Sequence, residues 1–240
     1  MTDFIYLDIA KMIDHSLLQP TLTDDDLDRG CRLAREYDVA SVCIKPYAVR
    51  RAAELLAGST VAVGTTIGFP HGGHVPAIKV AECRQAVADG ARELDVVVNI
   101  GKVLGGDWRY VADDVRAVVE AAHRDGALVK VIFENCFLND AQKERLCKIC
   151  GEAGADFVKT STGYGDAGAT DDDLRLMRRC SPPKVRVKAA GGVRTLDRLL
   201  AVRALGVTRV GATATKAILD ECKARQGDKE TRRQGDKEKG

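Results

Sequence analysis

The amino-acid sequence predicts a (β/α)8 TIM barrel, a single α/β domain with a short N-terminal helix and a disordered C-terminal tail. Apolar, strand-like segments alternate with helical segments eight times along the 240 residues, an alternation typical of parallel α/β folds. The strand-like segments are apolar almost throughout, as expected of parallel strands covered on both faces. An open doubly wound sheet is the alternative, but no G-x-G-x-x-G turn follows the first two strands.

Each expected strand is a run of apolar residues that stops at turn-forming residues. A short amphipathic helix over residues 3–12 precedes the first strand, which ends at Gln19-Pro20. The eight expected strands are residues 13–18, 39–44, 61–67, 93–99 and 128–134, the segments around Phe157 and Val187, and residues 207–210.

Helical periodicity occupies the segments between the strands. Thr23 followed by Asp26 is a variant of the capping box, with Asp in place of the usual Glu, and predicts where the first of these helices begins. The further expected helices cover residues 49–56, 77–88, 108–122, 140–153, 174–177 and 194–205.

The tail after residue 223 has a different composition from the rest of the chain. Residues 225–230 (RQGDKE) recur as residues 233–238, and such a charged, duplicated segment cannot bury a core. We therefore expect a single barrel domain over residues 1–223 and a disordered tail over residues 224–240.

Charge and hydropathy narrow the range of partners. The net charge is +2 and the tail is basic, so the body of the chain is close to neutral and gives no electrostatic case for nucleic acid. No apolar run approaches the ~18 residues of a membrane span, and the N-terminus lacks a signal-peptide pattern. We expect a cytoplasmic protein that binds neither nucleic acid nor membranes.

The chain holds eight scattered cysteines, which we expect to be reduced thiols. Cys147 and Cys150 form one C-x-x-C pair within a helical segment, but no second ligand pair stands at metal-binding spacing. The sequence predicts neither a metal site nor a cofactor.

Lys159 and Lys188 lie in neighbouring apolar strands, where an ammonium is costly because burial disfavours the charged form. Each lysine raises that cost for the other, and the cost is relieved if one becomes a neutral amine, which is a nucleophile. A surface lysine that reaches out between helices is the alternative for each residue taken alone. Lys130 and Asp95, which also lie in apolar strands, favour a functional cluster.

Alternation along the strands indicates which charged residues share the barrel interior. We expect Glu93 and Arg186, which come early in their strands, to form a structural ion pair. The inward-facing set comprises Glu93, Asp95, Lys130, Glu134, Lys159, Arg186 and Lys188.

Most of these polar groups lie near the C-terminal ends of their strands, where α/β barrels build active sites. Glycines follow the last three strands there, at Gly163, Gly165, Gly191, Gly192 and Gly211. Backbone N–H groups in such loops can bind a phosphate, although glycines that only form tight turns are the alternative.

Residues 93–97, 157–163, 187–195 and 211–213 together closely resemble the deoxyribose-phosphate aldolase family. The resemblance covers nearly the whole chain up to the tail. It implies a TIM barrel with metal-independent class I aldolase activity in deoxynucleoside catabolism. The implied reaction cleaves 2-deoxy-D-ribose 5-phosphate to acetaldehyde and D-glyceraldehyde 3-phosphate. We expect these small phosphosugar and aldehyde substrates, no cofactor, and a homo-oligomer.

The resemblance also implies roles for single residues. Lys159 matches the Schiff-base lysine, Lys188 the second lysine, and Asp95 the acid/base aspartate. We expect Lys188 to supply the charge that lowers the pKa of Lys159. Asp14 and Lys130 match substrate-pocket residues. The residues expected around the phosphate are Thr162, Gly163, Gly191, Gly192, Gly211 and Thr213.

The chain departs from some family members at two points. Tyr164 replaces a lysine, and the tail lacks the C-terminal tyrosine that assists proton transfer. Three alternatives remain open: a class I aldolase of the same superfamily acting on another phosphosugar, a phosphosugar isomerase with a carboxylate base, and a catalytically silent phosphosugar-binding module.

Overall fold

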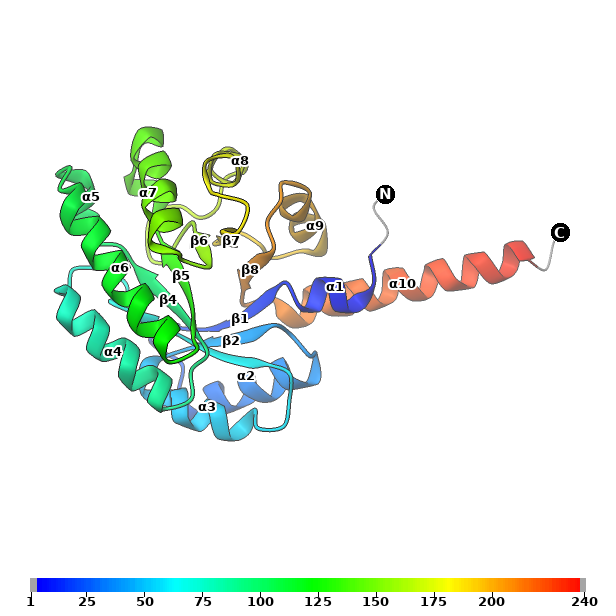
Figure 1. Cartoon of the computed structure of the whole chain (residues 1–240). Helices are drawn as coiled ribbons and strands as arrows, with labels where there is room; N and C mark the ends of the chain where they lie inside the picture. The colour runs from blue at the N-terminus through cyan, green and yellow to red at the C-terminus, as the bar shows by residue number, and fades with distance from the viewer. Residues whose placement is uncertain (1–3, 238–240) are drawn as a thin grey trace.

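The computed structural model describes the backbone of residues 4–237 and the side chains as far as Gly227. Eight parallel strands pair in chain order and close into a barrel, which confirms the predicted TIM barrel (Figure 1). The strands are β1 (Ile13–Leu17), β2 (Ser41–Ile44), β3 (Ala62–Ile67), β4 (Glu93–Val97), β5 (Leu128–Ile132), β6 (Phe157–Lys159), β7 (Arg186–Ala190) and β8 (Arg209–Ala212).

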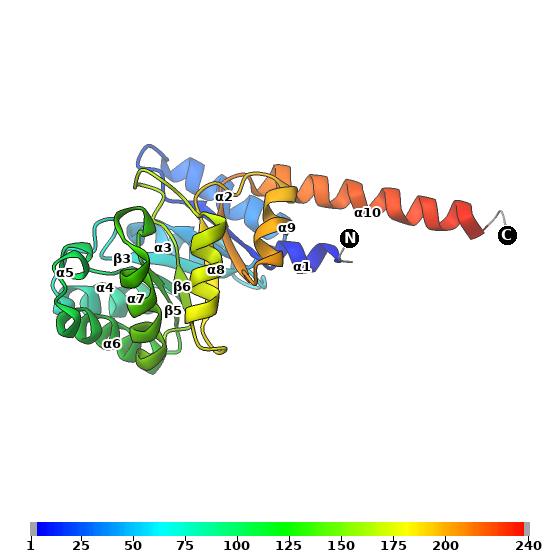
Figure 2. The same ribbon diagram turned by 90° about the horizontal axis from the view of Figure 1, so that it is seen from above.

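Helices surround the barrel (Figures 1 and 2). They are α1 (Tyr6–Ala10), α2 (Asp24–Glu36), α3 (Val49–Leu55), α4 (Pro76–Ala88), α5 (Ile100–Leu104), α6 (Trp108–Arg124), α7 (Asp140–Ala153), α8 (Asp171–Cys180), α9 (Leu196–Ala204) and α10 (Thr215–Lys237). The predicted capping box is present at α2, where the backbone N–H of Asp26 donates to the Thr23 hydroxyl and the Asp26 carboxylate accepts from the Thr23 N–H. The sequence analysis did not predict α5, whose first turn is capped by the side chain of Asn99.

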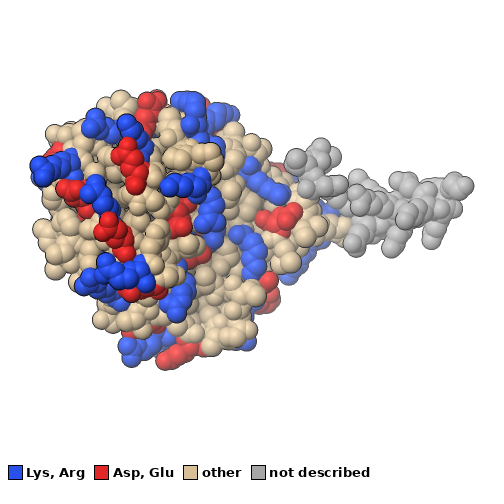
Figure 3. Space-filling model, viewed as in Figure 1, with Lys and Arg blue, Asp and Glu red and all other residues tan. Residues whose placement is uncertain are grey.

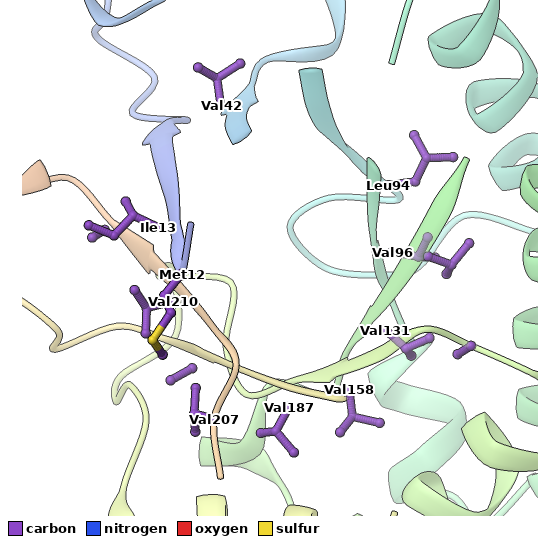
Figure 4. Packing of buried hydrophobic residues seen from close by; sticks show 14 of the residues in the cluster. Met12, Ile13, Val42, Leu94, Val96, Val131, Val158, Val187, Val207 and Val210 are labelled. Atoms are coloured by element: carbon purple, nitrogen blue, oxygen red, sulfur yellow. The ribbon is translucent and has the colours of Figure 1, made fainter. Parts of the chain in front are cut away.

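The apolar core lies between the strands and the helices that cover them. Val96, Val131, Val158 and Val187 are almost fully buried there, on four successive strands (Figure 4). Burying each valine contributes roughly 1.5–3 kcal/mol. Because side chains alternate along a strand, these valines leave the neighbouring positions to face the barrel interior. The interior can therefore hold polar groups without disrupting the apolar core.

The strand register aligns the charged residues of the interior. Lys159 on β6 pairs with Lys188 on β7, which in turn pairs with Arg209 on β8. Asp95 on β4 pairs with Lys130 on β5. Residues in register on parallel strands point to the same side of the sheet, so the fold itself gathers these groups.

Helix α10 extends away from the barrel, with α1 beside its first part (Figures 1 and 2). The expected domain boundary at residue 223 falls inside this helix. Arg225 binds Asp197 at 2.7 Å, and the Gln226 side chain donates to the Phe4 carbonyl at 3.0 Å, so the folded body reaches at least Gln226. Disorder of the remaining tail stays a prediction.

The surface is mixed in charge. On the face shown in Figure 3, basic and acidic side chains are interspersed, in line with the near-neutral charge of the body. Among the helices that the structure describes, none is both long enough and apolar enough to span a membrane.

Candidate active site

A cavity of about 170 Å³ opens at the C-terminal ends of the strands. Residues from β1, β2, β6, β7, β8 and the loops that follow line it. Nine residues that the sequence analysis assigned to catalysis or substrate binding are among them: Asp14, Lys159, Thr162, Gly163, Lys188, Gly191, Gly192, Gly211 and Thr213. The fold therefore gathers most of the predicted site around one cavity.

Asp95 joins the two lysines. Its Oδ2 accepts hydrogen bonds from Lys159 Nζ and from Lys188 Nζ, each at 2.7 Å. The two nitrogens therefore lie no more than twice this distance apart. Lys159 and Lys188 are 3% and 1% exposed and Asp95 is fully buried, so the three groups interact in a nearly dry environment.

A second carboxylate, Asp14, binds the other side of Lys188. Asp14 Oδ2 also lies 3.1 Å from Lys130 Nζ, and its Oδ1 contacts Arg209 Nη1 at 2.5 Å. Lys130 and Arg209 share Glu93, at 2.6 Å and 2.9 Å. We call this connected set the buried charge cluster; it comprises Asp14, Glu93, Asp95, Lys130, Lys159, Lys188 and Arg209.

The structure corrects the position expected for Lys130. This lysine is fully buried and, like Asp95, is not among the residues that line the described cavity. Its ammonium instead binds three carboxylates, those of Asp14, Glu93 and Asp95. Lys130 is thus placed to hold these carboxylates, and its expected contact with substrate stays a prediction.

The expected ion pair between Glu93 and Arg186 is also wrong. The Arg186 guanidinium stacks over the Phe157 ring at 3.9 Å, and Arg209 takes its place on Glu93. Sequence reasoning missed Arg209, although alternation extended to the eighth strand would have put it on the inward face. Alternation indicates which face a side chain occupies, but not which partner it meets across the barrel.

The two lysines differ in their pKa. Burial lowers the pKa of Lys159, the charge of Lys188 lowers it further, and the hydrogen-bonded Asp95 only partly opposes them. Burial acts in the same direction on Lys188, but there Asp14 and Asp95 outweigh it, so its pKa is raised. The expected effect of Lys188 on Lys159 is present, but burial is the larger cause. The site therefore combines one lysine that holds its proton more tightly than usual with one whose ammonium loses its proton more easily than usual.

Asp14, Asp95 and Lys130 stay charged. Burial alone would raise the pKa of Asp95 and Asp14, but the cations around them lower both pKa values. Burial likewise opposes the charge of Lys130, yet its three carboxylates raise its pKa well above the usual value. Both aspartates are therefore carboxylates at neutral pH.

Glycine-rich loops form the other end of the cavity. Gly163, Gly191 and Gly192 have φ values of 91°, 79° and 91°, which L side chains rarely adopt. A Cβ on Gly191 would meet the Cα of Gly168 at 2.7 Å, so only glycine allows these two loops to approach. Arg194 adds a cation to the cavity wall.

Two residues at the glycine-loop end of the cavity, Thr162 and Tyr164, already hydrogen-bond to neighbouring protein groups. The Thr162 hydroxyl and backbone N–H both donate to Glu134, so these two donors are occupied. The Tyr164 hydroxyl donates to the Leu18 carbonyl at 2.8 Å, and its ring meets Phe69 edge-on at 5.5 Å. Tyr164 thus links three loops at the mouth of the cavity.

Three further residues with ionisable side chains, Cys43, His71 and His74, lie in different environments. Cys43 lines the cavity, and burial followed by the charge of Asp95 raises the pKa of its thiol to about 11, so it is protonated at neutral pH. His71 and His74 are absent from the described cavity lining, and His74 contacts Glu82 at 3.2 Å. Within residues 4–227, no three His, Cys, Asp or Glu side chains are grouped so as to hold a metal ion.

Comparisons with known proteins give consistent matches. A family model described as DeoC/LacD family aldolase matches residues 9–219. The deoxyribose-phosphate aldolase of Rhodopirellula baltica is 59% identical over 227 residues, which cover 95% of this chain and 94% of that protein. The deoxyribose-phosphate aldolase of Thermococcus gammatolerans is 46% identical over 216 residues, with coverage of 89% and 96%.

The structural comparison agrees with the sequence comparison. A solved structure described as the unique tetrameric structure of deoxyribose phosphate aldolase from Aeropyrum pernix matches with a TM-score of 0.84 and 30% identity. It covers 91% of this chain and 92% of that chain. The family match spans all eight strands and every residue of the buried charge cluster. The chain therefore belongs to the DeoC/LacD family of aldolases.

Proposed function

We propose that the chain is a deoxyribose-phosphate aldolase. It reversibly cleaves 2-deoxy-D-ribose 5-phosphate to acetaldehyde and D-glyceraldehyde 3-phosphate through a Schiff base on Lys159. One observation carries the proposal: Lys159 presents a buried amine of lowered pKa to the cavity, and its carboxylate partner Asp95 also binds the ammonium of Lys188. The names of the relatives support this choice of substrate.

In the synthetic direction, the neutral Lys159 nitrogen adds to the carbonyl carbon of acetaldehyde and forms a carbinolamine. Protonation of its hydroxyl and loss of water give the imine. A proton then leaves the methyl carbon, and the C–H electron pair moves towards the nitrogen to form the enamine. The enamine carbon attacks the aldehyde carbon of glyceraldehyde 3-phosphate, and hydrolysis of the new imine releases the product. Cleavage runs through the same steps in reverse.

Asp95 and Lys188 serve the proton transfers of this sequence. Asp95 accepts a hydrogen bond from Lys159 Nζ, so it can take a proton as that nitrogen bonds to carbon. Lys188 is an ammonium in the resting site and lines the cavity, so it can donate a proton to the departing hydroxyl or stabilise the developing alkoxide. The Arg194 cation and the glycine loops complement the phosphate at the other end of the cavity.

Trapping the imine tests the proposal. Treatment with acetaldehyde and borohydride should add a reduced two-carbon group to Lys159, and Lys159→Leu should abolish this label. Lys143→Leu is the matched control, because Lys143 is a buried, ion-paired lysine between α7 and α8 outside the barrel. A label on another lysine in the wild-type protein would contradict the assignment.

The substrate requires a separate measurement. Rates of retro-aldol cleavage of several sugar phosphates should be highest with 2-deoxy-D-ribose 5-phosphate. Faster cleavage of another phosphosugar would favour the alternative aldolase. Phosphosugar turnover or binding without a lysine adduct would favour an isomerase or a silent binding module.

We also propose that the protein acts in the cytoplasm, in deoxynucleoside catabolism, as a homo-oligomer that binds neither nucleic acid nor membranes. Ile5 and Leu7 support an interface near α1, because these large apolar side chains are 63% and 47% exposed. The Aeropyrum pernix relative is described as tetrameric. Light scattering of the purified chain tests the oligomeric state, and a monomer at all concentrations would contradict the homo-oligomer.

A further inference from the structure

The buried charge cluster contains more basic groups than acidic ones. Its carboxylates are Asp14, Glu93 and Asp95, and its basic groups are Lys130, Lys159, Lys188 and Arg209. The lysines and aspartates are at most 3% exposed, and the Arg209 side chain is 11% exposed. An uncompensated charge in such an interior is costly. The cluster is balanced when one of its four basic groups is neutral.

The number of carboxylate partners identifies that group. Lys130 contacts three carboxylates, while Lys188 and Arg209 contact two each. Lys159 contacts only Asp95, through an oxygen that it shares with Lys188. Losing the proton of Lys159 therefore gives up the fewest favourable contacts.

Arg209 differs from the lysines because a guanidinium does not lose its proton in proteins. Its Nη1 contacts Asp14 at 2.5 Å and Glu93 at 2.9 Å, so a permanent cation engages two of the three carboxylates. Arg209 is not among the residues that line the described cavity, and it reaches the cavity-lining residue Asp14 through an ion pair. Any effect of Arg209 on the reaction must act through the cluster.

We propose that Arg209 is a positioning residue whose permanent charge balances one carboxylate, so that three lysines share two negative charges and Lys159 remains an amine. This inference rests on the proposed function, because it takes Lys159 as the nucleophile. It adds a residue of β8, remote from the substrate, to the groups that control the nucleophile.

The other ionisable groups that face the cluster do not alter this balance. Cys43 on β2 is a protonated thiol, and β3 brings no ionisable side chain to the interior. Arg186 on β7 is a further cation, but it is only partly buried and stacks on Phe157. Within the described residues it has no carboxylate at ion-pair distance, so solvent rather than the cluster offsets its charge. The groups that face Arg209 and Lys159 are Asp14 (β1), Cys43 (β2), Glu93 and Asp95 (β4), Lys130 (β5), Arg186 and Lys188 (β7).

The test measures how fast acetaldehyde and cyanoborohydride label Lys159 at a series of pH values, by peptide mass spectrometry. The pH dependence of the reductant is common to all variants, so it cancels in the ratio of each variant to wild type. Arg209→Met should shift the acid limb of the labelling profile to higher pH by ~1 unit. At pH values below the pKa of Lys159, this shift is a tenfold loss of the labelling rate. Arg209→Lys, which restores a cation, should move it back towards wild type.

Arg186→Met is the matched control. Arg186 and Arg209 both lie over the Phe157 ring, so this variant also removes an arginine from that ring. It leaves every ion pair of the buried charge cluster intact. Its profile should equal that of wild type.

Glu93→Gln removes a carboxylate instead of a cation and should shift the profile to lower pH, opposite to Arg209→Met. The double variant Arg209→Met with Glu93→Gln loses one charge of each sign and should return to the wild-type profile. If Arg209→Met does not fold, Glu93→Gln still tests the proposal.

The proposal for Arg209 would be overturned if the profiles of Arg209→Met and Glu93→Gln both coincided with wild type or shifted in the same direction. Labelling of Lys159 in the wild-type protein would still support the aldolase assignment in that case. Absence of labelling at Lys159 in wild type would instead overturn the proposed function itself.

Discussion

Lys159 and Lys188 show how much one contact changes a side chain's chemistry. Both are buried lysines on adjacent strands, and both donate to the same oxygen of Asp95 at 2.7 Å. Lys188 has one more carboxylate, Asp14, and its pKa is raised, whereas that of Lys159 is lowered. The second carboxylate thus makes the difference between Lys188, a stable ammonium, and Lys159, which can become an amine that attacks a carbonyl.

Replacing Lys188 with Leu should impair Lys159 in two ways. The loss of the neighbouring cation raises the pKa of Lys159, so the neutral fraction at pH 7 falls by roughly tenfold for each unit of the rise. The acid limb of the labelling profile should therefore move to higher pH. The loss of the proton donor should also lower kcat across the whole pH range.

Lys143→Leu provides the control for this variant, because it removes a buried ion-paired lysine remote from the cavity. A Lys188→Leu protein whose labelling profile equals that of wild type would show that burial alone sets the pKa of Lys159.

Among the loops, those at the mouth of the cavity are held together by Tyr164. This residue follows β6, bonds to the loop after β1 and packs against Phe69 in the loop after β3. Tyr164→Phe keeps the ring contact and removes only the hydrogen bond, which contributes ~1 kcal/mol. We expect KM for the phosphosugar to rise about fivefold with little change in kcat.

Tyr47→Phe is the control for that substitution, because Tyr47 is an exposed tyrosine that hydrogen-bonds to Asp24 outside the cavity. If Tyr164→Phe lowered kcat at constant KM, Tyr164 would instead take part in the chemical step.

The sequence predicts the strands well because parallel strands buried on both faces are continuous apolar runs. It also predicts the shared face of Asp95, Lys159 and Lys188, since alternation and the position near the strand end are local properties. It does not predict that Arg209, rather than Arg186, binds Glu93. That partner is set by how deeply side chains from opposite strands reach across a closed barrel.

Helix α10 marks another limit of sequence reasoning. Its C-terminal half is rich in Lys, Arg, Glu and Gln, residues that favour helices as well as disorder. Composition therefore does not distinguish the two states, and the domain boundary expected at residue 223 falls within the helix.

At the scale of the whole molecule, a truncation tests how far the folded body extends. Gln226 makes the last side-chain contact described between α10 and the N-terminal segment, with the Phe4 carbonyl. A chain that ends after Gly227 should keep the aldolase activity and the thermal midpoint of the full chain. A drop of several degrees would show that the remaining residues stabilise the barrel.

The stability of the molecule should depend on pH through His15. This residue is 7% exposed, its Nδ1 lies 2.8 Å from the Thr215 hydroxyl, and burial lowers its pKa from 6.5 to about 4. The unfolded chain therefore binds a proton more tightly between these values. The free energy of unfolding should be highest above pH 6.5 and fall by up to ~3 kcal/mol as the pH drops to about 4.

Urea unfolding at several pH values measures this slope. His15→Gln should remove most of it, whereas His74→Gln, at an exposed loop position, should leave it unchanged. Equal slopes in wild type and His15→Gln would assign the dependence to other groups.

Catalysis at this site requires that Lys159 lose its proton before Lys188 does. Nuclear magnetic resonance of protein with isotope-labelled lysine side chains measures this directly, with Lys159→Leu and Lys188→Leu to assign the two signals. We expect Lys159 to titrate below the ~10.4 of a free lysine while Lys188 remains charged. A Lys159 signal that titrates at or above that value, or a Lys188 that loses its proton first, would contradict this expectation.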